Sequence, residues 1–90
     1  MNHQEFMQRM MDLGYSNQEV DRLIWISVDG VESNLTQREY NFVPVGDGLY
    51  EVFLPSDRRG YFKASVSYGV PFVGSLEEAY LWVYKDRAGL

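Results

Sequence analysis

The sequence predicts an α+β fold, in which N-terminal helices, a three-stranded antiparallel sheet and a C-terminal helix packed on that sheet form a single domain over residues 1–90. Apolar residues recur at helical spacing near both ends of the chain, and they alternate with polar residues in between. Chains of this length bury only about 60–65% of their unfolded surface, so we expect one core shared by all the elements.

A first helix is predicted over residues 3–13, because five apolar side chains recur there at three- and four-residue spacing. Gly14 follows as a left-handed terminator. A second helix is predicted over residues 17–28, since Ser16 and Glu19 have the spacing of a capping box. The apolar side chains of the first helix are Phe6, Met7, Met10, Met11 and Leu13.

The end of the second helix has two interpretations. Residues 24–28 are rich in β-branched side chains and precede Asp29-Gly30, which is typical of a strand that leads into a tight hairpin turn. The capping box and the helical spacing favour a helix that ends at Gly30. For residues 31–39 a short helix is favoured over a polar connection, so residues 1–40 are expected to be mainly helical.

Antiparallel strands are predicted over residues 41–74. The first begins near Tyr40, and Pro44 favours an edge position because proline cannot donate to a sheet ladder. The elements after it are a turn at 46–48, a strand at 49–54, a loop at 55–60, a half-buried strand at 61–68 and an extended link at 68–74.

The C-terminal helix is predicted over residues 75–87. Ser75 and Glu78 form another capping box, and Gly89 follows the last turn. Cations near the C-terminal end are favoured by the helix dipole, and two are present. The predicted buried stripe is Leu76, Ala79, Tyr80 and Val83, and the cations are Lys85 and Arg87.

Composition argues against most kinds of active site. The chain has no cysteine, and its one histidine, His3, lies near a terminus, so thiol chemistry is excluded and a histidine-based triad is disfavoured. We expect no catalytic residue, no cofactor and no metal ion, and therefore not an enzyme. The chain also has no signal-peptide pattern and no run of about 20 apolar residues, which predicts a cytoplasmic protein without a membrane partner.

The charge distribution favours a protein partner with a basic surface. The net charge is −5, and residues 1–40 hold seven acids against three bases. We hypothesise a non-enzymatic protein-binding module, in a sharper version a phage- or mobile-element-type acidic inhibitor of a host nucleic-acid-handling protein. A homodimer is a further option. The candidate protein-binding residues are Glu19, Asp21, Asp29 and Glu32 in the acidic half, with Trp82 and Tyr84, which fall outside the buried stripe of the last helix.

The alternative hypothesis is a small nucleic-acid-binding accessory domain. A basic and aromatic hairpin tip could contact phosphates and stack on bases. Its candidate residues are Arg58, Arg59, Lys63 and Tyr61. Three cations are few for phosphate binding, so this function is the second choice.

Overall fold

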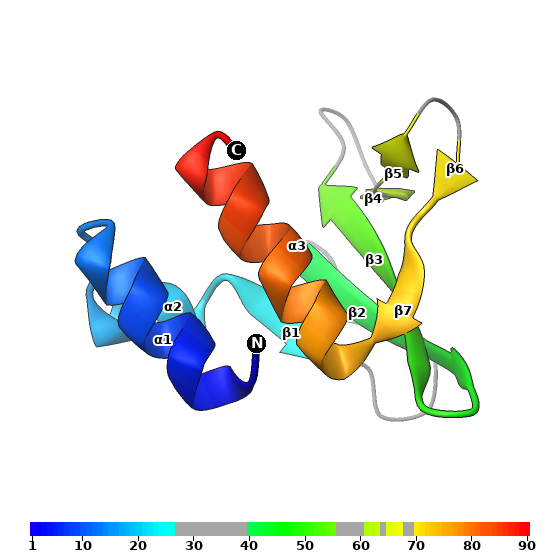
Figure 1. Cartoon of the computed structure of the whole chain (residues 1–90), viewed down its shortest axis with the longest axis horizontal. Coiled ribbons are helices and arrows are strands. Elements are labelled where there is room, and N and C mark those ends of the chain that lie inside the picture. Colours follow the sequence, from blue (N-terminus) through cyan, green and yellow to red (C-terminus); the bar gives the residue numbers. More distant parts are fainter. Residues whose placement is uncertain (27–39, 56–60, 64, 68–69) are drawn as a thin grey trace.

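The computed structural model describes residues 1–26, 40–55, 61–63, 65–67 and 70–90. It confirms the predicted α+β fold of N-terminal helices, a sheet and a C-terminal helix packed on it (Figure 1). No described helix is both long and apolar enough to cross a membrane. In chain order the elements are α1 (His3–Asp12), α2 (Asn17–Asp21), β1 (Ile24–Ile26), β2 (Tyr40–Gly46), β3 (Leu49–Pro55), β4 (Tyr61–Lys63), β5 (Ser65–Ser67), β6 (Val70–Pro71), β7 (Val73–Ser75) and α3 (Leu76–Ala88).

The first and last helices form where the sequence predicts them. The residue after α1's C-cap is Gly14, which has a φ of 106°, and Gly89 caps α3 with a φ of 76°. Both φ values are positive, and glycine adopts them without steric strain because it has no Cβ atom. The capping box of α3, between Ser75 and Glu78, is also confirmed.

The prediction of a helix over residues 17–28 is wrong beyond Asp21. Ser16 and Glu19 do form the predicted capping box, but α2 has only five residues. Residues 24–26 form strand β1 instead, since two β-branched isoleucines flanking a tryptophan suit a sheet better than a helix. β1 pairs with β2 in parallel, so these two strands do not make a hairpin. The short helix favoured for residues 31–39 lies outside the described residues.

A tight hairpin joins β2 and β3. Its two loop residues, Asp47 and Gly48, have φ values of 55° and 72°, and an Asp-Gly pair with two positive φ angles is what such a turn favours. The edge position predicted from Pro44 is wrong for β2 as a whole, because β2 lies between β1 and β3. The described pairing with β1 ends at Phe42, so Pro44 lies beyond it.

The strand predicted over residues 61–68 is interrupted. β4 pairs with β3 as far as Lys63, opposite Phe53, and β7 resumes the pairing at Val73, opposite Glu51. The two described strands between these points, β5 and β6, pair with each other in a separate two-stranded sheet. β3 runs antiparallel to both of its neighbours, β2 and the interrupted strand, and β1 adds a strand parallel to β2 at the edge.

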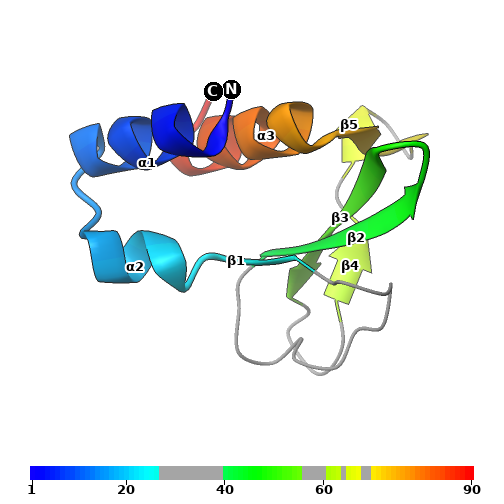
Figure 2. The same ribbon diagram turned by 90° about the horizontal axis from the view of Figure 1, so that it is seen from below.

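The core lies between the sheet and the layer formed by α1 and α3. The two helices lie side by side and run in the same direction (Figure 2). At their starts the N-terminus of the chain approaches Glu77, and near their ends Arg9 lies over the Tyr84 ring. The cross-strand pair Phe42 and Val52 is fully buried beneath them. The other buried core residues are Phe6, Met10, Val20, Leu23, Tyr40, Phe72, Ala79, Tyr80 and Val83.

Candidate protein-binding site

A pocket of about 130 Å³ opens at the edge of the molecule where α1, α2, β1 and α3 meet. Five of its seven lining residues carry aliphatic or aromatic side chains, which we call the apolar wall, although polar atoms supply more of the accessible lining than apolar atoms do. The other two lining residues, His3 and Asp21, are ionisable and exposed. Its lining residues are His3 and Phe6 from α1, Val20 and Asp21 from α2, Ile24 and Ile26 from β1, and Tyr80 from α3.

Local sequence signals determine which side chains face this pocket. The capping box at Ser16 sets the start of α2, and Val20 then faces the core with 4% of its surface exposed. Alternate residues of a strand share a face, so Ile24 and Ile26 point to the helix side of the sheet, together with their partners in β2. The short helix α2 and the edge strand β1 therefore supply four of the lining residues, and α1 and α3 supply the other three.

Tyr80 forms the inner wall and is held firmly. Its ring contacts Phe6 at 5.0 Å, Phe42 at 5.5 Å and His3 at 5.6 Å between centroids. Burial, and to a smaller extent the nearby Tyr50, raises the pKa of Tyr80 above its ordinary value. The pocket wall thus presents a neutral aromatic ring in a fixed position.

Asp21 and Glu19, both predicted to bind a partner, have different surroundings. Glu19 Oε1 accepts the backbone N–H of Ser16 at 3.0 Å, and Ser16 Oγ accepts the Glu19 N–H at 3.2 Å. The hydrogen bond to the Ser16 backbone, followed by that to its side chain, lowers the pKa of Glu19. The carboxylate of Asp21 has no hydrogen bond or ion pair with any residue described in the structure. Only Asp21 lines the pocket; Asp29 and Glu32 lie outside the described residues.

Trp82 and Tyr84 lie elsewhere on α3 and do not line the pocket. Both are half-buried and pack against the core. The Trp82 ring lies 6.4 Å from that of Tyr40 and 6.5 Å from that of Phe72, and Tyr84 lies under the Arg9 guanidinium at 5.9 Å. These contacts explain why aromatic residues occur outside the predicted buried stripe.

The residues of the nucleic-acid hypothesis do not form a described site. Tyr61 and Lys63 belong to β4, where only the backbone is described, and Arg58 and Arg59 lie outside the described residues. Among the described residues there is also no group of three or more side chains that could hold a metal ion.

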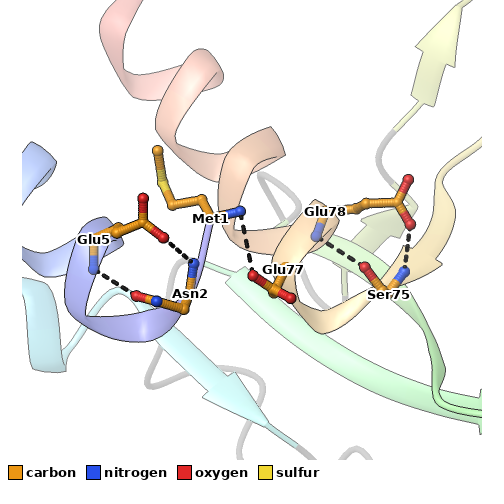
Figure 3. A network of polar contacts seen from close by, with 6 residues as sticks. All are labelled: Met1, Asn2, Glu5, Ser75, Glu77 and Glu78. Carbon is orange, nitrogen blue, oxygen red and sulfur yellow. Dashed lines mark hydrogen bonds and ion pairs between the residues drawn. The ribbon is translucent and has the colours of Figure 1, made fainter.

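Three polar contacts were not foreseen from the sequence. The Tyr40 hydroxyl donates to Asp86 Oδ2 at 2.5 Å, and burial followed by this carboxylate raises the pKa of Tyr40 well above its ordinary value. Figure 3 shows the starts of α1 and α3, where the N-terminal ammonium lies 3.8 Å from Glu77 Oε1. Asn2 and Glu5 form a further capping box there. The Tyr40–Asp86 hydrogen bond joins β2 to α3, the ion pair joins the starts of α1 and α3, and the capping box fixes the start of α1.

No protein family, no curated protein and no solved structure matches this chain.

Proposed function

We propose that the chain is a non-enzymatic protein-binding module and that the pocket between α1, α2 and β1 anchors a partner with a basic surface. The observation that carries this proposal is a small pocket lined mainly by aliphatic and aromatic residues, with a carboxylate at its wall, Asp21, that has no partner among the described residues. Protein interfaces draw much of their binding energy from a few side chains that fill such pockets.

The size of the pocket favours a protein partner over a metabolite. Small-molecule sites usually enclose about 300–1,000 Å³, whereas this pocket has about 130 Å³. That space suits one amino-acid side chain, with the rest of the partner lying on the surrounding surface.

The charge of the chain favours a basic partner. The net charge of −5 would accelerate association with a positively charged surface and disfavour acidic partners. Nucleic-acid-handling proteins carry clustered Lys and Arg side chains that contact phosphates. An acidic inhibitor, of the type that phages and mobile elements encode, would compete for such a surface in the cytoplasm. The cysteine-free composition suits that reducing compartment.

The test is affinity capture from a host lysate with variants that differ only at the pocket. Ile24→Trp places a larger ring at the pocket wall. Leu49→Trp is the matched control, because Leu49 is 38% exposed on β3 and does not line the pocket. Circular dichroism and a thermal melt should first establish that both variants are folded.

We expect the wild type and Leu49→Trp to retain the same partner and Ile24→Trp to lose it. Raising the salt concentration should release the partner, because the attraction between the acidic module and a basic surface is screened. If a folded Ile24→Trp variant retained every captured protein at wild-type levels, the pocket would not be the binding site.

A further inference from the structure

We propose that the occupant of this pocket is a single arginine or lysine side chain of the partner, with its methylene stem against the apolar wall and its cation at Asp21. This inference rests on the proposed function and specifies the chemistry that the pocket recognises. The walls of the pocket and the charge at its wall both support it.

The apolar wall suits the stem of a long cationic side chain. Ile24 and Ile26 are half-buried, and Tyr80 and Phe6 are buried behind them. Lys and Arg side chains commonly lay their methylene groups along apolar surfaces while their charged ends reach a polar or wet site. A pocket of about 130 Å³ that is open to solvent on one side has room for such a stem.

The carboxylate of Asp21 provides the site for the cation. It is exposed and has no partner among the described residues, so it can pair with an incoming group without breaking a contact to any of them. Glu19, two residues earlier in α2, is already engaged by Ser16. The pocket thus offers one available carboxylate next to an apolar wall.

A neutral occupant fits the same space less well. A leucine, methionine or phenylalanine side chain would cover the apolar wall but would leave the Asp21 charge beside a dry interface without a partner. An arginine satisfies the wall and the charge together. Arginine should bind more tightly than lysine, because its planar guanidinium can donate two parallel hydrogen bonds to a carboxylate.

The test is a titration of the full chain, labelled at its isoleucine methyl groups, with four capped amino acids. These probes are the N-acetyl amides of arginine, lysine, citrulline and norleucine. Citrulline has nearly the shape of arginine without its charge, and norleucine retains only the apolar stem. We expect arginine to shift the methyl signals of Ile24 and Ile26, with an affinity about fivefold above that of citrulline, which is the range of an exposed ion pair.

Two variants with the same change in net charge locate the charge effect. Asp21→Asn should abolish the preference for arginine over citrulline. Asp47→Asn should keep it, because Asp47 lies in the β2–β3 turn and asparagine tolerates its positive φ of 55°. Added salt should weaken arginine binding to the wild type and leave citrulline binding nearly unchanged.

Each contrary result overturns the cationic occupant. Equal binding of arginine and citrulline, a preference that survives Asp21→Asn, or no shift at Ile24 and Ile26 with about 100 mM arginine probe would do so. Loss of the partner in Ile24→Trp would then still support the proposed function with a neutral side chain in the pocket. Retention of the partner in Ile24→Trp would instead remove the proposed function, whichever probe binds.

Discussion

Gly74→Ala should destabilise the joint between the sheet and α3. Gly74 is buried in β7, and a Cβ atom there would lie 2.9 Å from Phe72 Cζ, 3.0 Å from Glu78 Oε1 and 3.2 Å from Glu78 Cβ. The backbone of Gly74 is not left-handed, so alanine can adopt it and the conflict is one of space. Both crowded side chains have contacts that they would have to give up in order to move away. Phe72 is in the core, and Glu78 Oε1 accepts the Ser75 N–H at 2.8 Å.

The size of the effect follows from two opposing contributions. Overpacking at a tight site costs about 1–3 kcal/mol, and replacing glycine recovers about 0.4–1 kcal/mol by restricting the unfolded chain. The middle of the two ranges leaves a loss of about 1–2 kcal/mol in the free energy of unfolding, which for a domain of this size lowers the melting temperature by roughly 5–15 °C.

Urea denaturation of Gly74→Ala, Glu78→Ala and the double variant measures this directly. Glu78→Ala removes the contact with Oε1 and keeps the one with Cβ, so the alanine at position 74 should cost less in the Glu78→Ala background. A Gly74→Ala variant as stable as the wild type, or an equal cost in both backgrounds, would refute the reasoning.

Four further outcomes follow from the same contacts. Ser16→Ala should lower the free energy of unfolding by about 1 kcal/mol in urea denaturation, because the capping box of α2 is lost. Phe6→Ala should cost about 3–5 kcal/mol in the same assay, since this ring is 1% exposed in the core. The hydrogen bonds that lower the pKa values of Glu19 and Glu78 stabilise the fold while each carboxylate is ionised. Stability followed by circular dichroism should therefore fall as the pH drops below about 4.3, the ordinary pKa of glutamate, and continue to fall through their lowered values. The raised pKa of Tyr40 has the opposite sign, so its contribution is complete below about pH 10 and should be lost as the pH rises further. A flat stability profile at either extreme, or wild-type stability of either alanine variant, would contradict the corresponding contact.

Local signals account for the parts of the fold that the sequence predicted. The capping boxes at Ser16 and Ser75 join residues three positions apart, so they can be recognised without knowing any tertiary contact. The Asp47-Gly48 turn is equally local. These signals mark where helices and hairpins begin, and they carry no information about where α2 ends.

The parts that were mispredicted depend on pairing between distant residues. Leu23 and Ile24 fit the helical spacing, but the pairing of Ile24 and Ile26 with Tyr40 and Phe42 in β2 makes residues 24–26 a strand. Alternation over residues 61–68 indicates which side chains share a face and does not indicate the partner strand. It therefore could not show that β4 pairs with β3 whereas β5 pairs with β6 in a separate sheet.

The candidate site was predictable only in part. The acidic character of the first forty residues indicated Asp21 as a binding residue, and the structure places it at a pocket. The same reasoning could not separate Asp21 from Glu19, because their difference lies in the Ser16 hydrogen bonds. The apolar wall was missed because Ile24 comes from an edge strand and Tyr80 from a helix more than fifty residues away in the sequence.

The most direct test of the central claim is a nuclear Overhauser measurement on the complex of this chain with its captured partner. The methyl groups of Ile24 and Ile26 should show contacts to the methylene protons of one arginine or lysine side chain of the partner. Contacts from an apolar side chain alone would contradict the cationic occupant. Methyl groups that keep their solvent exposure and chemical shifts in the complex would contradict the binding site itself.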